Sequence, residues 1–194
     1  MIALAPAAAP PRRRQLFVGT AMAAGAAAMV LGGQLALYLQ IRDINGGNTK
    51  KWLPAKTVVP EVAANTMLVT IYATSLIVQW AVYSAHRGDR RHAGYALGLT
   101  ATMAIAAIVA QVRIYDDMAV KVAKGPYGPL FYGISGTFLL LLVIGIGFAV
   151  VAALRTLGGR ETAADREIVS ATALWFHMAS GVFTFVWFVL YAVK

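Results

Sequence analysis

Residues Leu130–Leu154 read LFYGISGTFLLLLVIGIGFAVVAAL, a stretch of 25 residues that contains no charged side chain. A helix rises about 1.5 Å per residue, so a helix of this length would be about 37 Å long. The hydrocarbon layer of a bilayer is about 30 Å thick. The stretch therefore predicts a helix that spans a membrane.

Four further apolar stretches of similar length accompany it along the chain. They are Gln15–Gln40, Glu61–Tyr83, Ala93–Ile114 and Ile168–Val193. Apolar residues make up 59% of the 194 residues and charged residues only 13%, well below the quarter that is typical of soluble domains. The pattern predicts an all-α membrane protein in which residues 15–194 form one bundle of five transmembrane helices. We expect residues 1–14 to form a flexible tail that ends in an arginine anchor.

The connections between the spans indicate an orientation. If the N-terminus is cytoplasmic, nine positive residues fall on the inner side and eight on the outer side. Several of the inner residues, such as Arg87, Arg90 and Arg91, lie in very short connections between spans. The positive-inside effect acts at such places. We therefore expect a cytoplasmic N-terminus and, because the number of spans is odd, a C-terminus outside.

Composition excludes several classes of function. The chain has no cysteine, so it forms neither a disulfide nor a thiolate metal site. Its formal charge of +9 is spread over the flanks of the spans, which suits anionic lipid headgroups and argues against nucleic-acid binding. The sequence also lacks a glycine-rich phosphate loop and a nucleophile constellation.

Small residues in two spans predict close helix packing. Gly94 and Gly98 form a Gly-x-x-x-Gly pattern in the third span, which lets two backbones approach closely. Packing against a neighbouring span is the expected role, and contact with another subunit is the alternative. The first span is similarly rich in small residues: Gly19, Ala23, Ala27, Ala28, Gly32 and Gly33. The bulky run Leu139–Val143 is expected to face lipid.

Polar residues inside the spans are the candidates for function, because they are costly in hydrocarbon. Asn65 lies in the second span, Gln111 in the third and His177 in the fifth. His177 is the one histidine well inside a span, whereas a bis-histidine haem needs two and a zinc or copper site usually needs three or four ligands. We therefore expect His177 to be a buried, hydrogen-bonded structural residue, and no haem or metal in this chain.

The remaining polar residues have simpler explanations. Gln34 and Gln79 lie toward span ends, where hydrogen bonds between helices are more common than chemistry. Arg113 stands near the end of the third span, with Asp116 and Asp117 within one turn. This spacing favours an ion pair at the membrane interface.

Three segments resemble one known family. The last span, Leu174–Tyr191, reads LWFHMASGVFTFVWFVLY and is similar to the last helix of subunit III of the haem-copper terminal oxidases, in its five-helix form. Gln111–Asp117 and Gly125–Tyr132 resemble the polar end of one helix of that family and the entry to the next. By this resemblance, the chain is a divergent member of the subunit III family. Asn65 and Ser180 stand where the family has acids, and its histidine pattern is missing near Ser135.

The resemblance implies a function. Subunit III holds no haem or copper, packs against the catalytic subunit I and other oxidase subunits, and shelters phospholipid between its helices. We therefore expect an accessory subunit of a cytochrome c or quinol oxidase in a bacterial inner membrane, with haem and copper held by its partners. A nitric-oxide-reductase-type complex is a close variant. A small transporter or channel using Arg113, Gln111, Asn65 and His177, or an enzyme centred on His177, are alternatives from other classes.

Overall fold

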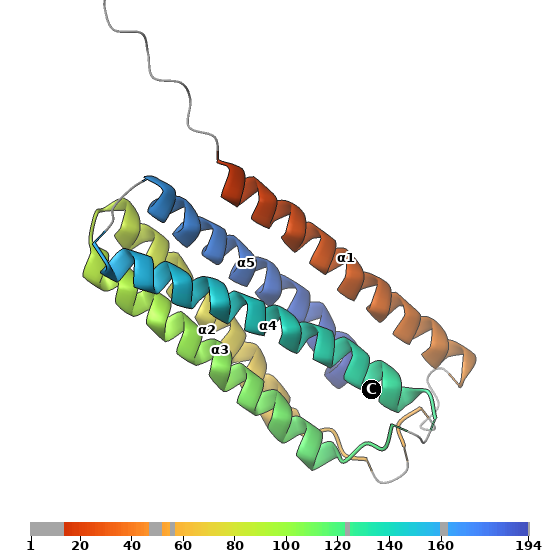
Figure 1. The fold of residues 1–194 in the computed structure, drawn as a ribbon. Helices are drawn as coiled ribbons and strands as arrows, with labels where there is room; N and C mark the ends of the chain where they lie inside the picture. The colour runs from red at the N-terminus through yellow and green to blue at the C-terminus, as the bar shows by residue number, and fades with distance from the viewer. Residues whose placement is uncertain (1–13, 47–51, 55–56, 123–124, 160–162, 194) are drawn as a thin grey trace, which may run out of the picture.

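The structure is a computed structural model that describes residues 14–46, 52–54, 57–122, 125–159 and 163–193. Apart from Arg14, the predicted flexible tail lies outside these residues. Five long helices fill the described part of the chain, and each is long and apolar enough to cross a membrane (Figure 1). The predicted all-α fold with five such helices is therefore confirmed. They are α1 (Gln15–Ile44), α2 (Glu61–His86), α3 (Arg90–Met118), α4 (Tyr127–Leu157) and α5 (Ala163–Trp187).

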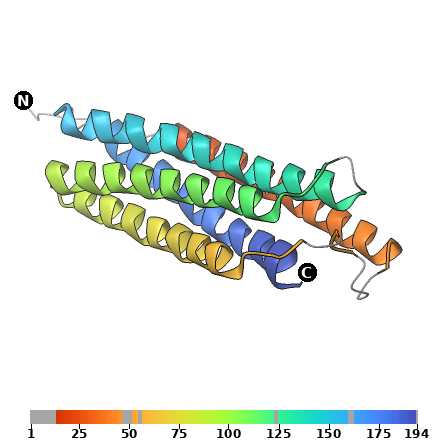
Figure 2. The same cartoon turned by 90° about the horizontal axis from the view of Figure 1, so that it is seen from below.

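The helices run along a common direction, and α5 lies between α1 and the rest of the bundle. Helices α2, α3, α4 and α5 pack against one another in a ring, while α1 lies against α5 and α4 (Figures 1 and 2). The apolar part of α1 is accordingly only 17% buried, against 44% for α5. Helix α5 continues into one π-helical turn, Phe188–Ala192.

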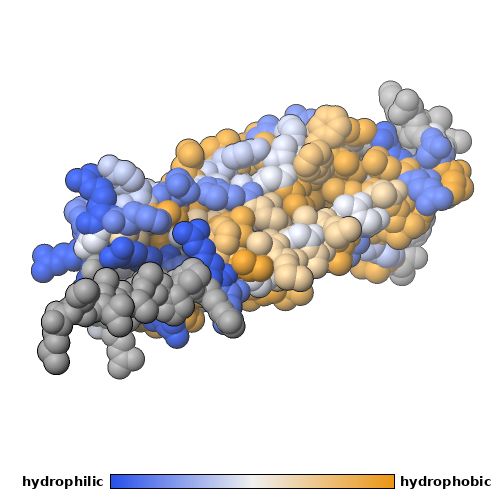
Figure 3. Space-filling view, turned by 90° about the horizontal axis from the view of Figure 1, so that it is seen from above, coloured by the Kyte–Doolittle hydropathy of each residue, from blue (hydrophilic) through white to orange (hydrophobic). Residues whose placement is uncertain are grey.

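The two ends of the bundle can be told apart by the connections they carry. The first end holds the start of α1 and the α2–α3 and α4–α5 connections (Figure 1). The second end holds the α1–α2 and α3–α4 connections and the last residues of the chain. Between the ends, the visible surface is a broad apolar band, and hydrophilic side chains gather at both extremities (Figure 3). This division is the one expected of a protein whose middle meets hydrocarbon.

A short turn at the first end joins α2 to α3. Gly88 has a φ of +77°, a conformation that glycine adopts without steric cost. Asp89 then caps α3, since its Oδ1 accepts a hydrogen bond of 3.1 Å from the His92 N–H. That bond and the contact between Asp89 Oδ2 and His92 Nδ1 hold the pKa of Asp89 below its ordinary value. The cap lets α3 begin at Arg90, three residues before the predicted apolar stretch.

Only part of the predicted close packing is present. A Cβ atom placed on Gly94 would lie 2.5 Å from the Leu157 side chain, so this glycine does lie in a tight contact. A Cβ atom on Gly98 would meet nothing within 4 Å, and the same holds for the glycines of α1. The expected packing of Gly98 and of the α1 glycines against a neighbouring span is therefore wrong, because these glycines face outward. The alternative, contact with another subunit, stays a prediction.

A tight contact between α4 and α5 occurs at a glycine that the sequence did not single out. A Cβ atom on Gly145 would lie 3.0 Å from the rings of both Phe176 and Trp175.

The prediction that the run Leu139–Val143 of α4 faces lipid is only half right. Leu140 is 58% exposed, but Leu142 is buried in the core. The run alternates between the two environments because a helix turns by about 100° per residue.

We predict that Gly145→Leu destabilises the bundle, because the added side chain must displace the two rings of α5. Overpacking of this kind costs about 1–3 kcal/mol. Gly98→Leu adds the same side chain where nothing opposes it, and serves as the matched control. Thermal unfolding in mild detergent should show a lower Tm for the first variant and an unchanged Tm for the second. Equal Tm values would contradict the assigned contact.

We also predict that Glu167 anchors the start of α1. Glu167 Oε1 on α5 accepts a hydrogen bond of 2.9 Å from the Phe17 N–H, which is one of the amides that a helix start leaves without a partner. Glu167→Leu should speed hydrogen exchange in the first turn of α1, whereas Glu167→Gln keeps an acceptor and should change it less. Unchanged exchange in both variants would remove this role.

Candidate functional site

Polar side chains join α2 to α5 along one line of the bundle. Trp187 Nε1–H donates a hydrogen bond of 3.0 Å to Asn65 Oδ1. Farther from the second end, the hydroxyls of Tyr72 and Thr184 lie 2.7 Å apart. Closer to the first end, His177 bonds to two residues of α2. We call this row the α2–α5 seam, and its members are Asn65, Tyr72, Ser75, Gln79, His177, Thr184 and Trp187.

The hydrogen bonds of His177 define its tautomer. Its Nε2 lies 3.0 Å from Gln79 Oε1, which only accepts, so Nε2 carries the proton. Its Nδ1 lacks a proton in the neutral ring and therefore accepts from the hydroxyl of Ser75. Both ring nitrogens are thus engaged by α2. The expected hydrogen bonds of this histidine are present, but its expected burial is wrong, because His177 is exposed on the outside of the seam.

The other two histidines lie apart from the seam. His86 Nδ1 lies 2.8 Å from the backbone oxygen of Val82, one turn back in the same helix. His92 pairs with Asp89 at the start of α3. Within the described ranges, no three His, Asp or Glu side chains come together in a group that could hold a metal ion.

A second polar cluster lies at the second end and is buried. Tyr191 Oη donates a hydrogen bond of 3.1 Å to Gln111 Oε1, and Trp52 Nε1–H donates one of 2.9 Å to Tyr38 Oη. Tyr127 packs edge-on against both Tyr38 and Trp52. The cluster ties α1, its following connection, α3, α4 and the π-helical turn together. The sequence singled out Gln111 as a candidate and placed Tyr191 and Tyr127 in the segments that resemble the family, but it did not predict their contacts, and it did not single out Tyr38 or Trp52.

Gln111 and Arg113 lie on opposite faces of α3. Gln111 is 1% exposed, whereas the side chain of Arg113 is 71% exposed. Arg113 Nε lies 3.3 Å from Asp117 Oδ1, so the ion pair suggested by the sequence forms with Asp117, and Asp116 is exposed beside it. Asn65 and His177 belong to the seam on α2 and α5. The four residues considered for a transport path therefore point to three different places.

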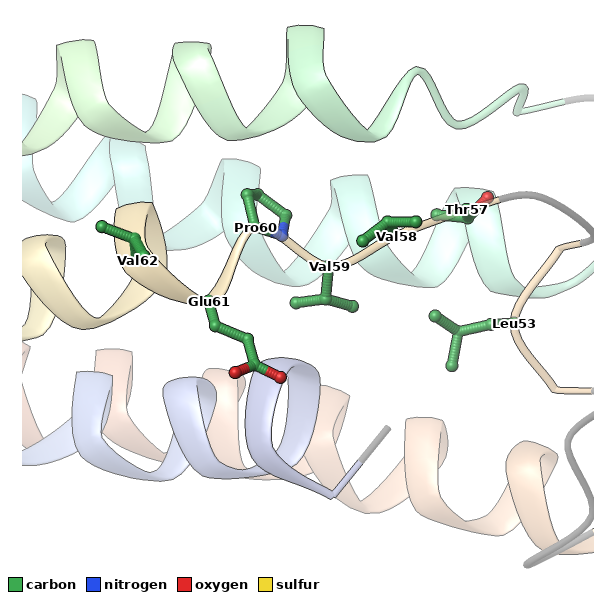
Figure 4. A pocket seen from close by; sticks show the side chains of 7 residues that line it. All are labelled: Leu53, Thr57, Val58, Val59, Pro60, Glu61 and Val62. Atoms are coloured by element: carbon green, nitrogen blue, oxygen red, sulfur yellow. The ribbon is translucent and has the colours of Figure 1, made fainter.

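Two shallow hollows lie at the second end, near the start of α2. The first is apolar apart from Glu61 and Thr57, and it is lined by Leu53 and by residues 57–62 (Figure 4). Glu61 points from this hollow toward the end of α5 (Figure 4). The second hollow lies at the end of the α2–α5 seam that is nearest the second end of the bundle. Its lining includes Glu61, Asn65, Trp187 and Tyr191. Neither lining contains a nucleophile beside a general base.

The family model and the individual relatives that match this chain point to the same family. The family model for cytochrome c oxidase subunit III matches residues 50–193, which include α2 to α5. Cytochrome c oxidase subunit 3 of Bos taurus is 27% identical over 121 residues, which is 62% of this chain and 46% of the relative. The same subunit of Rattus norvegicus is 26% identical over the same lengths.

The chain thus spans less than half the length of these curated relatives. The family model nevertheless covers well over half of the chain, and it does so across the four helices that form the ring. The chain belongs to the cytochrome c oxidase subunit III family.

Proposed function

We propose that this chain is an accessory subunit of a respiratory haem-copper oxidase. In that complex it stabilises the catalytic subunit and binds lipid. The family match over α2 to α5 carries this proposal. The side chains inside the helices support it, because they serve contacts between helices. His177, Gln111 and Asn65 each bond to a residue of another element. Haem and copper would then belong to partner subunits, and the electron donor would be cytochrome c or a quinol.

The membrane arrangement forms part of the proposal. We infer that the first end of the bundle faces the cytoplasm of a bacterial inner membrane. Arg87 lies in the short α2–α3 turn, Arg90 and Arg91 begin α3, and Arg155 lies in the last turn of α4 at the same end. Arginines at such places favour the cytoplasmic side. Phospholipid would cover the apolar band on the face seen in Figure 3.

Affinity purification of the tagged chain from native membranes in mild detergent tests the proposed function. We expect the catalytic subunit to co-purify, with a haem spectrum and copper in the purified complex. The same tag on an unrelated five-helix protein controls for non-specific capture. A purified chain without haem-copper subunits would remove the proposed function, and a nitric-oxide-reductase-type partner would change the class of complex.

His177 should support assembly rather than cofactor binding. His177→Ala removes two hydrogen bonds between α2 and α5, each worth about 0.6 kcal/mol on average within membranes. We expect a lower Tm and less of the chain in the complex, with unchanged haem content per intact complex. His86→Ala, which alters a histidine bonded only within its own helix, is the matched control. Loss of haem from an intact complex would assign His177 to a cofactor instead.

A further inference from the structure

The α2–α5 seam places polar side chains on the outside of the bundle, at the depth of the membrane core. Tyr72 lies 11 residues after the start of α2 and 14 before its end, so it is near the middle of the span. It is 45% exposed, and His177 and Gln79 are exposed as well. Polar residues inside membrane proteins almost always face the bundle interior or a water-filled cavity. The exposure of the seam is therefore unfavourable if lipid tails cover it.

Other outward faces of the bundle differ from the seam. The outward side of α1 includes Met22 at 73% exposed and Met29 at 80% exposed, and that of α4 includes Leu140. These side chains suit contact with lipid tails. The contrast indicates that the seam meets protein while these faces meet lipid.

The hydrogen bonds within the seam determine what it still offers. Asn65 Oδ1 accepts from Trp187, and Gln79 Oε1 accepts from His177. Both residues are exposed, and their amide nitrogens are donors that these two hydrogen bonds do not use. A surface that presents hydrogen-bond acceptors to these two nitrogens would match the seam.

The spacing of these donors favours a helix as the occupant. Asn65 and Gln79 are 14 residues apart, which is about 21 Å along α2. Gln79 also lies about 10 Å from the end of its helix, deeper than a lipid headgroup at the first end would lie. One lipid headgroup cannot satisfy both donors, whereas a helix lying beside α2 can.

The rim of the seam suits a protein partner. Around the donors, the rim of the seam is apolar and aromatic, with Leu76 at 74%, Phe185 at 67% and Phe188 at 54% exposed. Aromatic side chains are enriched in the cores of protein interfaces.

We propose that the α2–α5 seam binds a transmembrane helix of another oxidase subunit, and that this helix presents hydrogen-bond acceptors to Gln79 and Asn65. The proposal rests on the proposed function, because that function supplies the neighbouring subunit. It adds the face of the chain that makes the contact and the chemistry that the partner helix needs.

Photo-crosslinking in the intact complex tests the occupant. A benzoylphenylalanine placed at Phe185 keeps an aromatic side chain on the seam, and one placed at Leu140 samples the outward face of α4. We expect the first to crosslink to a transmembrane segment of another oxidase subunit, identified by mass spectrometry, and the second to crosslink to lipid. Crosslinks from Phe185 to lipid alone, or to a second copy of the chain, would overturn the inference.

Substitution of the donors gives an independent measurement. Gln79→Leu and Asn65→Leu should each weaken retention of the chain in the complex by about threefold or more, as expected for a lost hydrogen bond in a membrane. Thr102→Val is the control, since Thr102 is exposed on α3 and bonds to its own helix. Equal retention of all three variants would overturn the inference. If no haem-copper subunit co-purifies even with the unaltered chain, the proposed function itself fails, and this inference fails with it.

Discussion

The need to satisfy polar groups without water governs this structure. Inside hydrocarbon, an unpaired polar group costs several kcal/mol, so the backbone forms helices and polar side chains bond to one another. Helix α5 shows the result most clearly. Trp175 Nε1–H donates to the backbone oxygen of Leu141 on α4, while His177, Thr184 and Trp187 bond to α2. Because α1 also packs against α5, this helix connects most of the bundle.

Two groups of polar side chains hold the helices together: the buried cluster at the second end and the α2–α5 seam. The cluster at the second end is buried, and Tyr191 and Gln111 join the end of the chain to α3 there. The seam is open on one side, although its internal hydrogen bonds are complete for His177. A buried cluster can only stabilise the fold of its own chain. An open seam of amides can also contribute binding energy to a neighbour, because its remaining donors are accessible.

The number of helices followed from hydropathy, but the direction in which each side chain points did not. Leu130–Leu154 was long and apolar enough to predict a span without knowledge of its neighbours. Gly94 and Gly98 share one sequence pattern, yet only Gly94 lies in a tight contact, because the position of α4 decides which glycine is covered. His177 was likewise expected to be buried, because it lies well inside a span. Its depth could be predicted from the sequence, whereas its exposure depends on how α1 and α2 flank α5.

The chemistry of the seam bears on how such a subunit would act. The resemblance to the family implies an acid near Asn65 and another near Ser180, whereas this chain carries an amide and a hydroxyl there. Neutral groups neither take up nor release protons across the usual pH range. His177 is the one titratable side chain among the seam's histidine, amide and aliphatic hydroxyl groups, and both of its ring nitrogens bond to residues of α2. A seam of this composition suits stable contact between helices better than a relay of protons, which needs groups that change charge.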